Sequence, residues 1–320
     1  MSVTESVAVV RVEDLHKRYQ AEGPEAVAGV DFEVLEGEIF GLLGPNGAGK
    51  TTTIGTITTR VKPTGGRVLV DGVDVSVDPV SAKLRIAAVP QMSNLDRALT
   101  ALENLTFHAA YFGAGRRERR ERARELLARF GLGGRENDHV NNYSGGMAQR
   151  LMIARAIFHR PAVLFLDEPT AGLDPQGRLA LWETLGELSS EGQTIVLLTH
   201  YMEEADQLCS RVAIMDHGTV LALDTPAALK HSVGADTIVT VKATGDRARL
   251  RDVLGHDLEG VERSRLVNGG VELLIKGAPR LLPRVVQAAD AAGFDVVDLS
   301  VAEPTLETVF INLTGKELRE

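Results

Sequence analysis

The sequence of 320 residues predicts an α/β fold followed by a small α+β domain. An apolar run at 38–43 leads directly into the glycine-rich segment 44-GPNGAGKTT-52, the pattern of a buried strand that enters a phosphate-binding loop. A second apolar run, 163-VLFL-166, ends in two adjacent carboxylates, as a buried parallel strand does at its carboxyl edge. The length exceeds one ordinary hydrophobic core, and the pattern changes after Thr225-Pro226, so we expect two domains.

The bulk composition limits the classes of protein that fit. The net charge of −9 argues against a large nucleic-acid surface, which needs clustered Lys and Arg, so no nucleic-acid partner is expected. The single cysteine, Cys209, rules out an internal disulfide and fits a reducing cytoplasm. No apolar stretch is long enough to span a bilayer, so any membrane-spanning part must come from another chain.

The segment 44–52 fits the phosphate-loop pattern G-x-x-x-x-G-K-[ST]. Its glycines allow the backbone N–H groups to approach phosphates closely at the start of a helix. Lys50 would place a positive charge on the β- and γ-phosphates, and the Thr51 hydroxyl would contact Mg²⁺. The helix expected near Lys50–Thr59 is rich in Thr and Ile, so tertiary packing must hold it. A turn without a ligand is the alternative, and the downstream carboxylates argue against it. The predicted nucleotide contacts in this loop are Gly44, Pro45, Asn46, Gly47, Ala48, Gly49, Lys50, Thr51 and Thr52.

The run 163-VLFLDEP-169 places two carboxylates at the carboxyl edge of the sheet, where ligands gather in open α/β folds. Asp167 can hold Mg²⁺, usually through water. Glu168 can orient or deprotonate an attacking water. Two solvated acids are a common alternative for such a pair in isolation, but a phosphate loop in the same chain favours the catalytic interpretation.

A third motif, 142-NYSGGMAQR-150, precedes an apolar helical pattern at Leu151–Phe158. Ser144, Gly145 and Gly146 would open this helix, with Ser144 as its N-cap. Bare N–H groups and the positive end of the helix dipole would make another anion site. A simple N-cap without a ligand explains the motif equally well on physical grounds. The chain thus has one phosphate loop but two surfaces that could bind a γ-phosphate, the loop itself and the start of this helix. This suggests that two chains meet around the nucleotide.

These motifs, in this order, resemble the ATP-binding cassette family, the nucleotide-binding subunits of ABC transporters. The resemblance covers roughly Val7 to Ala228. The phosphate loop resembles the Walker A motif, and the strand with its two carboxylates resembles Walker B. Tyr143–Met147 resembles the family signature Leu-Ser-Gly-Gly-Gln, with Tyr in place of Leu and Met in place of Gln but the Ser-Gly-Gly core intact.

The resemblance gives roles to four further residues. Gln91 resembles the Q-loop glutamine, which contacts Mg²⁺ and senses the membrane partner. Asp174 resembles the D-loop aspartate at the dimer seam. His200 resembles the switch histidine near the γ-phosphate, although a histidine that ends a buried strand is otherwise most often a packing residue. Tyr19 resembles the aromatic residue that stacks on adenine, although a Tyr at a strand end is usually a simple boundary residue.

The resemblance also implies a mechanism with ATP and Mg²⁺. Two cassettes would pack head to tail around two ATP molecules, each site combining the Walker motifs of one chain with Ser144, Gly145 and Gly146 of the other. Intact motifs favour a homodimer, and pairing with a sister chain is the alternative. Glu168 is the expected catalytic base, with His200 supporting the γ-phosphate. The chain would be cytoplasmic and bound peripherally to the inner face of the cell membrane, beneath a permease.

The nucleotide-binding domain is expected at residues 1–230, with a helical subdomain at about 92–143. Within that subdomain, the segment 116–130 mixes Arg and Glu with apolar residues near its end. An arginine-rich run can contact anionic lipid or nucleic acid, but this mixture favours the solvated face of an amphipathic helix.

Residues 236–320 predict an accessory domain with the order strand, helix, two strands, helix, strand, which is typical of a ferredoxin-like fold. A turn at Asn268-Gly269-Gly270 would join the two middle strands, and a last helix would begin within 303–315. The expected strands are at 237–243, 261–266, 271–276 and 294–301, and the expected helices are near 247–254 and 281–292.

The tail sharpens the resemblance. The segments 91-QMSNLDRALTALENL-105 and 303-EPTLETVF-310 are similar to those of the daunorubicin-resistance type of exporter ATPase. Such ATPases power a separate ABC-2 type permease that expels drugs, polyketides or lipid-linked molecules. The tail is then expected to stabilise or dimerise the protein, and a small-molecule regulatory domain is the alternative.

Three functions remain open from the sequence, and the energy subunit of an exporter is preferred. An importer ATPase whose tail senses its substrate comes second. A soluble ABC ATPase acting on DNA or ribosomes comes third, because the negative charge, the single cassette and the lack of a long coiled-coil insertion argue against it.

Overall fold

The computed structural model describes residues 7–267, 269–277 and 281–314. These residues separate between Thr225 and Pro226 into two compact units. The first unit contains two sheets and seven helices among its described residues, and the second contains one sheet with helices of its own.

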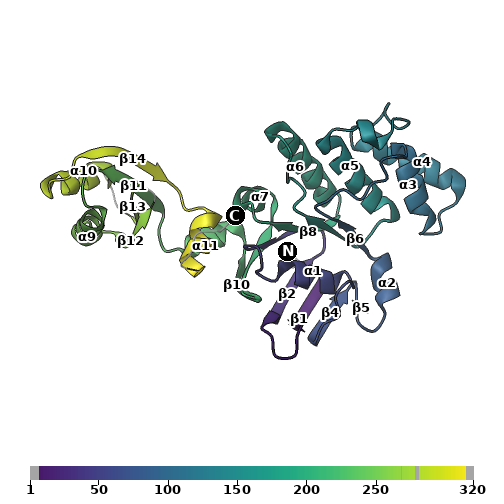
Figure 1. Cartoon of the computed structure of the whole chain (residues 1–320), viewed down its shortest axis with the longest axis horizontal. Helices are drawn as coiled ribbons and strands as arrows, with labels where there is room; N and C mark the ends of the chain where they lie inside the picture. Colours follow the sequence, from purple (N-terminus) through teal and green to yellow (C-terminus); the bar gives the residue numbers. More distant parts are fainter. Residues whose placement is uncertain (1–6, 268, 278–280, 315–320) are drawn as a thin grey trace, which may run out of the picture. The chain divides into compact units, whose positions relative to one another are not determined.

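A six-stranded sheet forms the centre of the first unit, in the order β10-β9-β3-β8-β7-β6 (Figure 1). Neighbouring strands from β9 to β6 run parallel, and β10 pairs antiparallel with β9. Every residue of β3 and β8 is buried, which explains why both are continuous apolar runs. The strands are β3 (Ile39–Leu43), β6 (Ile86–Val89), β7 (Val163–Asp167), β8 (Thr194–Thr199), β9 (Arg211–Asp216) and β10 (Thr219–Asp224).

A four-stranded antiparallel sheet, in the order β2-β1-β4-β5, shares a hydrophobic core with the central sheet. Val10 and Phe32 from this sheet join Phe40 and Phe165 of the central one. The rings of Phe32 and Phe40 stack with their centroids 5.3 Å apart. The strands are β1 (Ala8–Arg18), β2 (Glu25–Leu35), β4 (Gly65–Val70) and β5 (Val73–Asp74).

Helix α1 (Lys50–Ile57) begins where the loop after β3 ends, and it stops short of the predicted Thr59. Thr53, Ile54 and Ile57 are buried, so packing holds a helix whose residues are poor helix formers, as expected. The other helices beside the sheets are α2 (Pro79–Leu84), α6 (Pro175–Ser190) and α7 (Met202–Leu208).

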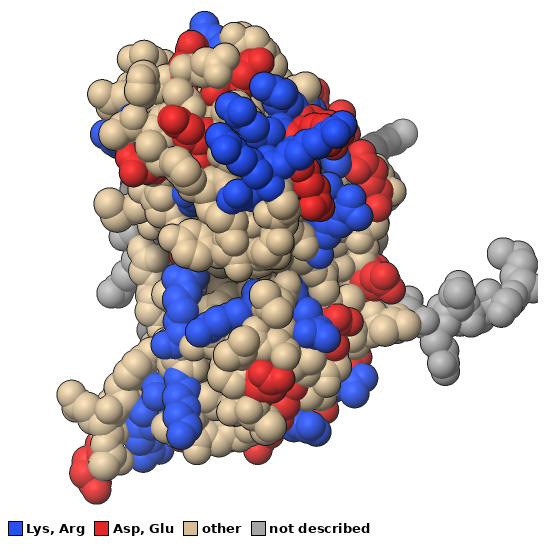
Figure 2. All heavy atoms as spheres, turned by 90° about the vertical axis from the view of Figure 1, so that its right-hand side faces the viewer, with Lys and Arg blue, Asp and Glu red and all other residues tan. Residues whose placement is uncertain are grey.

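A group of helices lies between β6 and β7 in the sequence, and Figure 1 shows them together within the first unit. Helix α4 is strongly charged, and Figure 2 shows Lys and Arg side chains gathered over this part of the surface with Asp and Glu between them. Leu126, Leu127 and Phe130 turn inward and are buried. The prediction of a solvated face on an amphipathic helix is therefore confirmed. The group contains α3 (Ala101–Ala110), α4 (Arg116–Arg129) and α5 (Gly145–Ala156), with 3₁₀ turns at Val140–Asn142 and Ile157–His159.

The second unit begins with α8 (Pro226–Ser232), followed by four strands in the order β12-β13-β11-β14, all antiparallel. Helices α9 and α10 pack on one face of this sheet through Leu250, Leu254, Val285 and Ala289. The predicted elements are present, although Asn268 of the predicted turn lies outside the described residues. The elements are β11 (Thr237–Ala243), α9 (Arg247–Asp257), β12 (Val261–Val267), β13 (Gly270–Ile275), α10 (Leu281–Ala291), β14 (Val296–Ala302) and α11 (Leu306–Thr314).

None of the helices in the described part of the chain combines the length and apolar character that crossing a bilayer requires.

Candidate active site

The phosphate loop forms a pocket between β3 and α1. The pocket has a volume of about 230 Å³ and is lined by every residue from Pro45 to Thr52. Ala26 of β2 also lines it. No sequence motif marks Ala26, because it lies in a strand far from the loop in the sequence.

Two glycines of the loop cannot carry a side chain. Gly49 has a φ of 103°, a left-handed conformation, and a Cβ atom there would lie 2.6 Å from the carbonyl oxygen of Ala26. A Cβ atom at Gly44 would lie 2.3 Å from the carbonyl oxygen of Met215. The close packing of the loop against neighbouring backbone therefore explains the glycines at these positions.

Lys50 is buried at the start of α1, with only 8% of its surface exposed. Its Nζ donates hydrogen bonds to the carbonyl oxygens of Gly44, at 2.5 Å, and Pro45, at 3.0 Å. Burial lowers the pKa of Lys50, and the charges of Glu168 and Asp167 partly oppose this. The ammonium group is thus held inside the loop by the loop's own backbone.

The two carboxylates at the end of β7 differ in their surroundings. Burial raises the pKa of Asp167, and the negative charge of Glu168 raises it further, while Arg60 and Lys50 lower it. Asp167 and Glu168, whose negative charge Arg60 and Lys50 offset only in part, form an oxygen-rich, electronegative site. Such a site suits a hard divalent cation.

Glu168 brings the predicted catalytic residues together. Its backbone φ is 47°, which is unusual for a residue other than glycine, and its N–H donates to the carbonyl oxygen of Leu198 at 2.9 Å. Its Oε1 lies 2.7 Å from Nδ1 of His200, and its Oε2 accepts a hydrogen bond of 2.7 Å from Nε2 of Gln91. Strained backbone of this kind occurs preferentially at functional sites. The carboxylate is therefore fixed from both sides by residues far apart in the sequence.

The serine-glycine motif opens helix α5 as predicted. Oγ of Ser144 accepts a hydrogen bond from the N–H of Met147 at 3.3 Å, so Ser144 is the N-cap. Ser144, Gly145 and Gly146 line a second pocket of about 540 Å³ together with Asp174. The Asp174 side chain also caps α6 through the N–H of Gly177, a role that its family position alone does not predict. These residues line a different pocket from the phosphate loop within the same chain.

Tyr19 follows β1 and is 63% exposed. Its hydroxyl lies 3.3 Å from Oγ1 of Thr52 in the phosphate loop, and Nζ of Lys17 lies 5.0 Å from the centre of its ring. The ring is thus placed beside the loop with much of its surface free.

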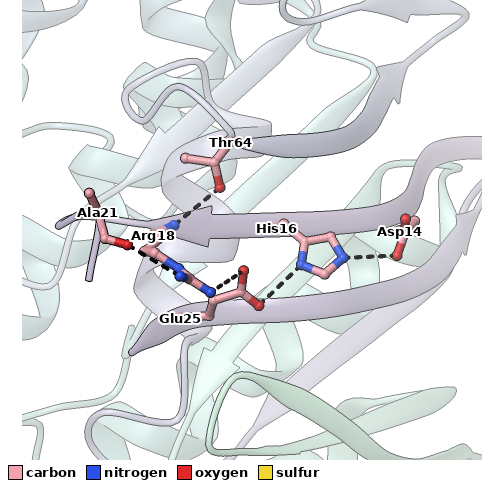
Figure 3. A network of polar contacts seen from close by, with 6 residues as sticks. All are labelled: Asp14, His16, Arg18, Ala21, Glu25 and Thr64. Atoms are coloured by element: carbon pink, nitrogen blue, oxygen red, sulfur yellow. Dashed lines mark hydrogen bonds and ion pairs between the residues drawn. The ribbon is translucent and has the colours of Figure 1, made fainter. Parts of the chain in front are cut away.

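A polar network fixes the hairpin that carries Tyr19 (Figure 3). His16 lies between the carboxylates of Glu25, 3.2 Å from Nδ1, and Asp14, 3.0 Å from Nε2. Arg18 forms an ion pair with Glu25 at 3.2 Å, and its backbone N–H donates to Thr64. Hydrogen bonds from His16 to Glu25 first and to Asp14 second raise the pKa of His16. The network ties β1 to β2 just before Tyr19 in the sequence.

Comparison with known proteins identifies the family. Residues 27–171 match the family model described as ABC transporter. A daunorubicin resistance ATP-binding protein of Streptomyces coeruleorubidus is 40% identical, over 96% of this chain and 95% of the other. The chain belongs to the family of ABC transporter ATP-binding proteins.

Other members of the family are similar over comparable lengths. A linearmycin resistance ATP-binding protein of Bacillus subtilis is 36% identical over 98% of this chain and all of the other. Nod factor export ATP-binding protein I of Cupriavidus metallidurans is 37% identical over 98% of this chain and 99% of the other.

Solved structures of ABC proteins match part of the chain. The structure of an ATP-binding subunit of an ABC transporter covers 71% of this chain and 93% of its own, with a TM-score of 0.63 and 32% identity. A dimeric ATP-binding cassette in a post-hydrolysis state with ADP and Pi covers 68% of this chain and 98% of its own, with a TM-score of 0.61 and 30% identity. This ABC protein accordingly binds and hydrolyses ATP.

Proposed function

We propose that this ABC protein is the energy-coupling subunit of an exporter, and that it drives a separate ABC-2 type permease to expel a drug, antibiotic or lipid-like molecule. The observation that carries the proposal is similarity over nearly the whole chain, second unit included, to proteins named for drug resistance and for export. An ATPase domain alone would be shared with ABC proteins of every kind. The accessory unit makes the similarity more specific.

The proposed nucleotide site contains the phosphate loop, with Lys50 on the β- and γ-phosphates. Thr51, Asp167 and Gln91 supply oxygen atoms that would hold Mg²⁺. Burial first and the charge of Glu168 second raise the pKa of Asp167, and a divalent cation would offset both effects. When bound, Mg²⁺ would offset the charge of the phosphates. Tyr19 would stack on adenine, which its exposed ring permits.

Glu168 is the proposed base for hydrolysis. Water attacks the γ-phosphorus, the bond from that phosphorus to the β,γ-bridging oxygen breaks, and a proton of the water passes to the Glu168 carboxylate. The hydrogen bonds from Gln91 and the contact with His200 hold this carboxylate in one orientation. His200 would in addition support the γ-phosphate. Products are ADP and inorganic phosphate.

The complete site would form between two chains. Ser144, Gly145 and Gly146 line a pocket separate from the phosphate loop, so they are available to the γ-phosphate bound by a second copy. Asp174 lies at the same pocket and would lie at the seam between the copies. We infer a homodimer with two equivalent sites, because one chain carries every motif.

The permease would dock on the surface that follows the Q-loop. Met92, Phe107 and Tyr111 are exposed large apolar side chains in this part of the chain. Exposed apolar side chains of this kind are typical of protein–protein contacts. Docking there would hold the protein on the inner face of the cell membrane.

We infer that the second unit is a ferredoxin-like domain. Its strand order and its βαββαβ sequence of elements support this assignment. We propose residues 1–230 as the nucleotide-binding domain, with a helical subdomain at about 92–143, and residues 236–320 as the accessory domain, although the division into compact units falls a few residues earlier, after Thr225. Its proposed role is to stabilise or dimerise the protein.

The test is co-purification of a tagged Glu168→Gln chain from its native cells in the presence of ATP. The substitution should trap the closed complex because it removes the base but leaves the nucleotide contacts. We expect a polytopic membrane protein of the ABC-2 class in the membrane fraction. Recovery with ribosomes or nucleic acid alone would contradict the transport proposal.

A further inference from the structure

A buried carboxylate lies next to the segments that carry Glu168 and His200, called the catalytic pair below. Glu204 of α7 is fully buried, with 0% of its surface exposed, and its Oε1 accepts a hydrogen bond from Nε1 of Trp182 at 3.3 Å. Burial raises the pKa of Glu204, and the hydroxyls of Thr199 and Thr170 and the indole N–H of Trp182 oppose this. Burying a carboxylate is costly unless other groups bind it, so its position calls for an explanation.

The neighbours of Glu204 belong to the two segments that carry the catalytic pair. Thr199 ends β8 and immediately precedes His200, and its Oγ1 accepts a hydrogen bond from the N–H of Tyr201 at 2.9 Å. Thr170 lies two residues after Glu168 and is itself buried. Glu204 is therefore in contact with both the segment that follows the proposed base and the strand end that presents the histidine.

Helix α6 supplies the other side of this cluster. Trp182 donates to the carboxylate, and the positive charge of Arg178 acts on it from the same helix. The guanidinium of Arg178 lies 5.6 Å from the ring centre of Tyr201, and its NH1 lies 3.9 Å from the carboxylate of Glu203. The helix that begins at the D-loop is thus joined to the loop after β8.

Three buried polar atoms in this cluster make no well-formed hydrogen bond within the described chain: Oε2 of Glu204, Nε of Arg178, and Oγ1 of Thr170, which is nevertheless close enough to Glu204 to lower its pKa. They comprise one acceptor and two donors. Folded proteins rarely leave such atoms unpaired. These donors and the acceptor are complementary, so a rearrangement that brings them together would add hydrogen bonds to the cluster.

We propose that Glu204 is a positioning residue for ATP hydrolysis, which ties the segment after Glu168 to the strand end that carries His200 and tightens when ATP binds. The inference rests on the proposed roles of Glu168 and His200. It assigns no contact between Glu204 and the nucleotide. Glu204 instead affects how Glu168 and His200 lie relative to each other, with Oε1 of Glu168 2.7 Å from Nδ1 of His200.

The protein contains its own reporter for this cluster, because Trp182 is the only tryptophan in the chain. Its indole N–H is bonded to Glu204 directly. A rearrangement around that carboxylate changes the polarity at the indole and therefore the intrinsic fluorescence. Nucleotide binding should be visible in the emission of the unlabelled protein.

The first experiment measures ATP hydrolysis by the full chain carrying Glu204→Gln, which keeps the volume and removes the charge. We expect kcat to fall about tenfold while KM for ATP stays within about twofold of wild type, the pattern of a group that acts on the catalytic geometry. Glu187→Gln is the matched control, because Glu187 is an exposed acid on helix α6, outside this cluster. Thr170→Val, which removes one hydroxyl at constant shape, provides a second variant if Glu204→Gln does not fold.

The second experiment follows the fluorescence of Trp182 when ATP is added to Glu168→Gln. We expect a change in emission that is lost or reversed when Glu204→Gln is added to this background, with ATP still bound. An unchanged signal in the double variant would overturn the inference. So would a parallel loss of kcat, ATP affinity and thermal stability in Glu204→Gln, which would make the residue purely structural.

Glu168→Gln separates this inference from the proposed function. If Glu168→Gln is inactive but Glu204→Gln and Thr170→Val turn over like wild type, only the inference about Glu204 fails. If Glu168→Gln itself turns over at the wild-type rate, the proposed base is wrong and the inference fails with it.

Discussion

Replacing His200 with alanine removes one of the two contacts that fix the Glu168 carboxylate. The contact is 2.7 Å long and involves a charged acceptor, and the hydrogen bond from Gln91 on the other oxygen remains. Hydrogen bonds to charged groups contribute about 1.5–3 kcal/mol. The side chain of His200 is 35% exposed, so water competes for it and the lower end of that range applies.

A loss of about 1.5 kcal/mol corresponds to about a tenfold fall in kcat, since about 1.4 kcal/mol is a factor of ten in rate. The assay is release of inorganic phosphate at saturating ATP, with ATP affinity measured separately by titration. A larger fall would measure an additional contact between His200 and the γ-phosphate. His256→Ala, at an exposed position on α9, is the control and should turn over like wild type. Wild-type turnover by His200→Ala would refute the reasoning.

Three further predictions concern other parts of the molecule. Lys50→Ala should weaken ATP binding by at least about tenfold in a nucleotide titration, because a charged hydrogen-bond donor to the phosphates is lost, and unchanged affinity would contradict its role. Hydrogen bonds to Glu25 first and Asp14 second raise the pKa of His16 above 6.5, so this pairing stabilises the protein fully below that pH, and the benefit disappears as the pH rises through the raised pKa. The difference in melting temperature between wild type and His16→Asn should therefore shrink between about pH 5.5 and pH 8, and a difference that grows with pH would contradict this. Phe310→Ala should cost the second unit about 3–5 kcal/mol in a urea titration, because Phe310 is buried, and an unchanged midpoint would show that α11 does not stabilise it.

The strands and the motifs of the first unit were predictable because their signals are local. An apolar run that ends in glycines or in two carboxylates predicts a strand from about ten consecutive residues. Strands β3 and β7 form where this pattern indicates. The tail was predictable for the same reason, since alternating short strands and helices follow one another with clear breaks. The predicted end of α1 was less accurate, because tertiary packing rather than helix propensity determines where that helix stops.

The contacts that make the site were not predictable from spacing. Gln91 and His200 meet Glu168 across sequence separations of 77 and 32 residues, and the left-handed backbone of Glu168 has no signal in its residue type. Ala26 lines the phosphate pocket although it lies in β2, outside the loop motif. Glu204 resembles any acid on a helix until the fold buries it. Family resemblance supplied the roles of several of these residues, but only the three-dimensional arrangement supplies their partners.

The most direct test of the central claim is the mass and bound nucleotide of purified Glu168→Gln after incubation with ATP. We expect a dimer that retains one unhydrolysed ATP per chain, while wild type under the same conditions releases phosphate and returns to monomers. A Glu168→Gln chain that remains monomeric and releases phosphate at the wild-type rate would contradict both the proposed base and the site shared between two copies.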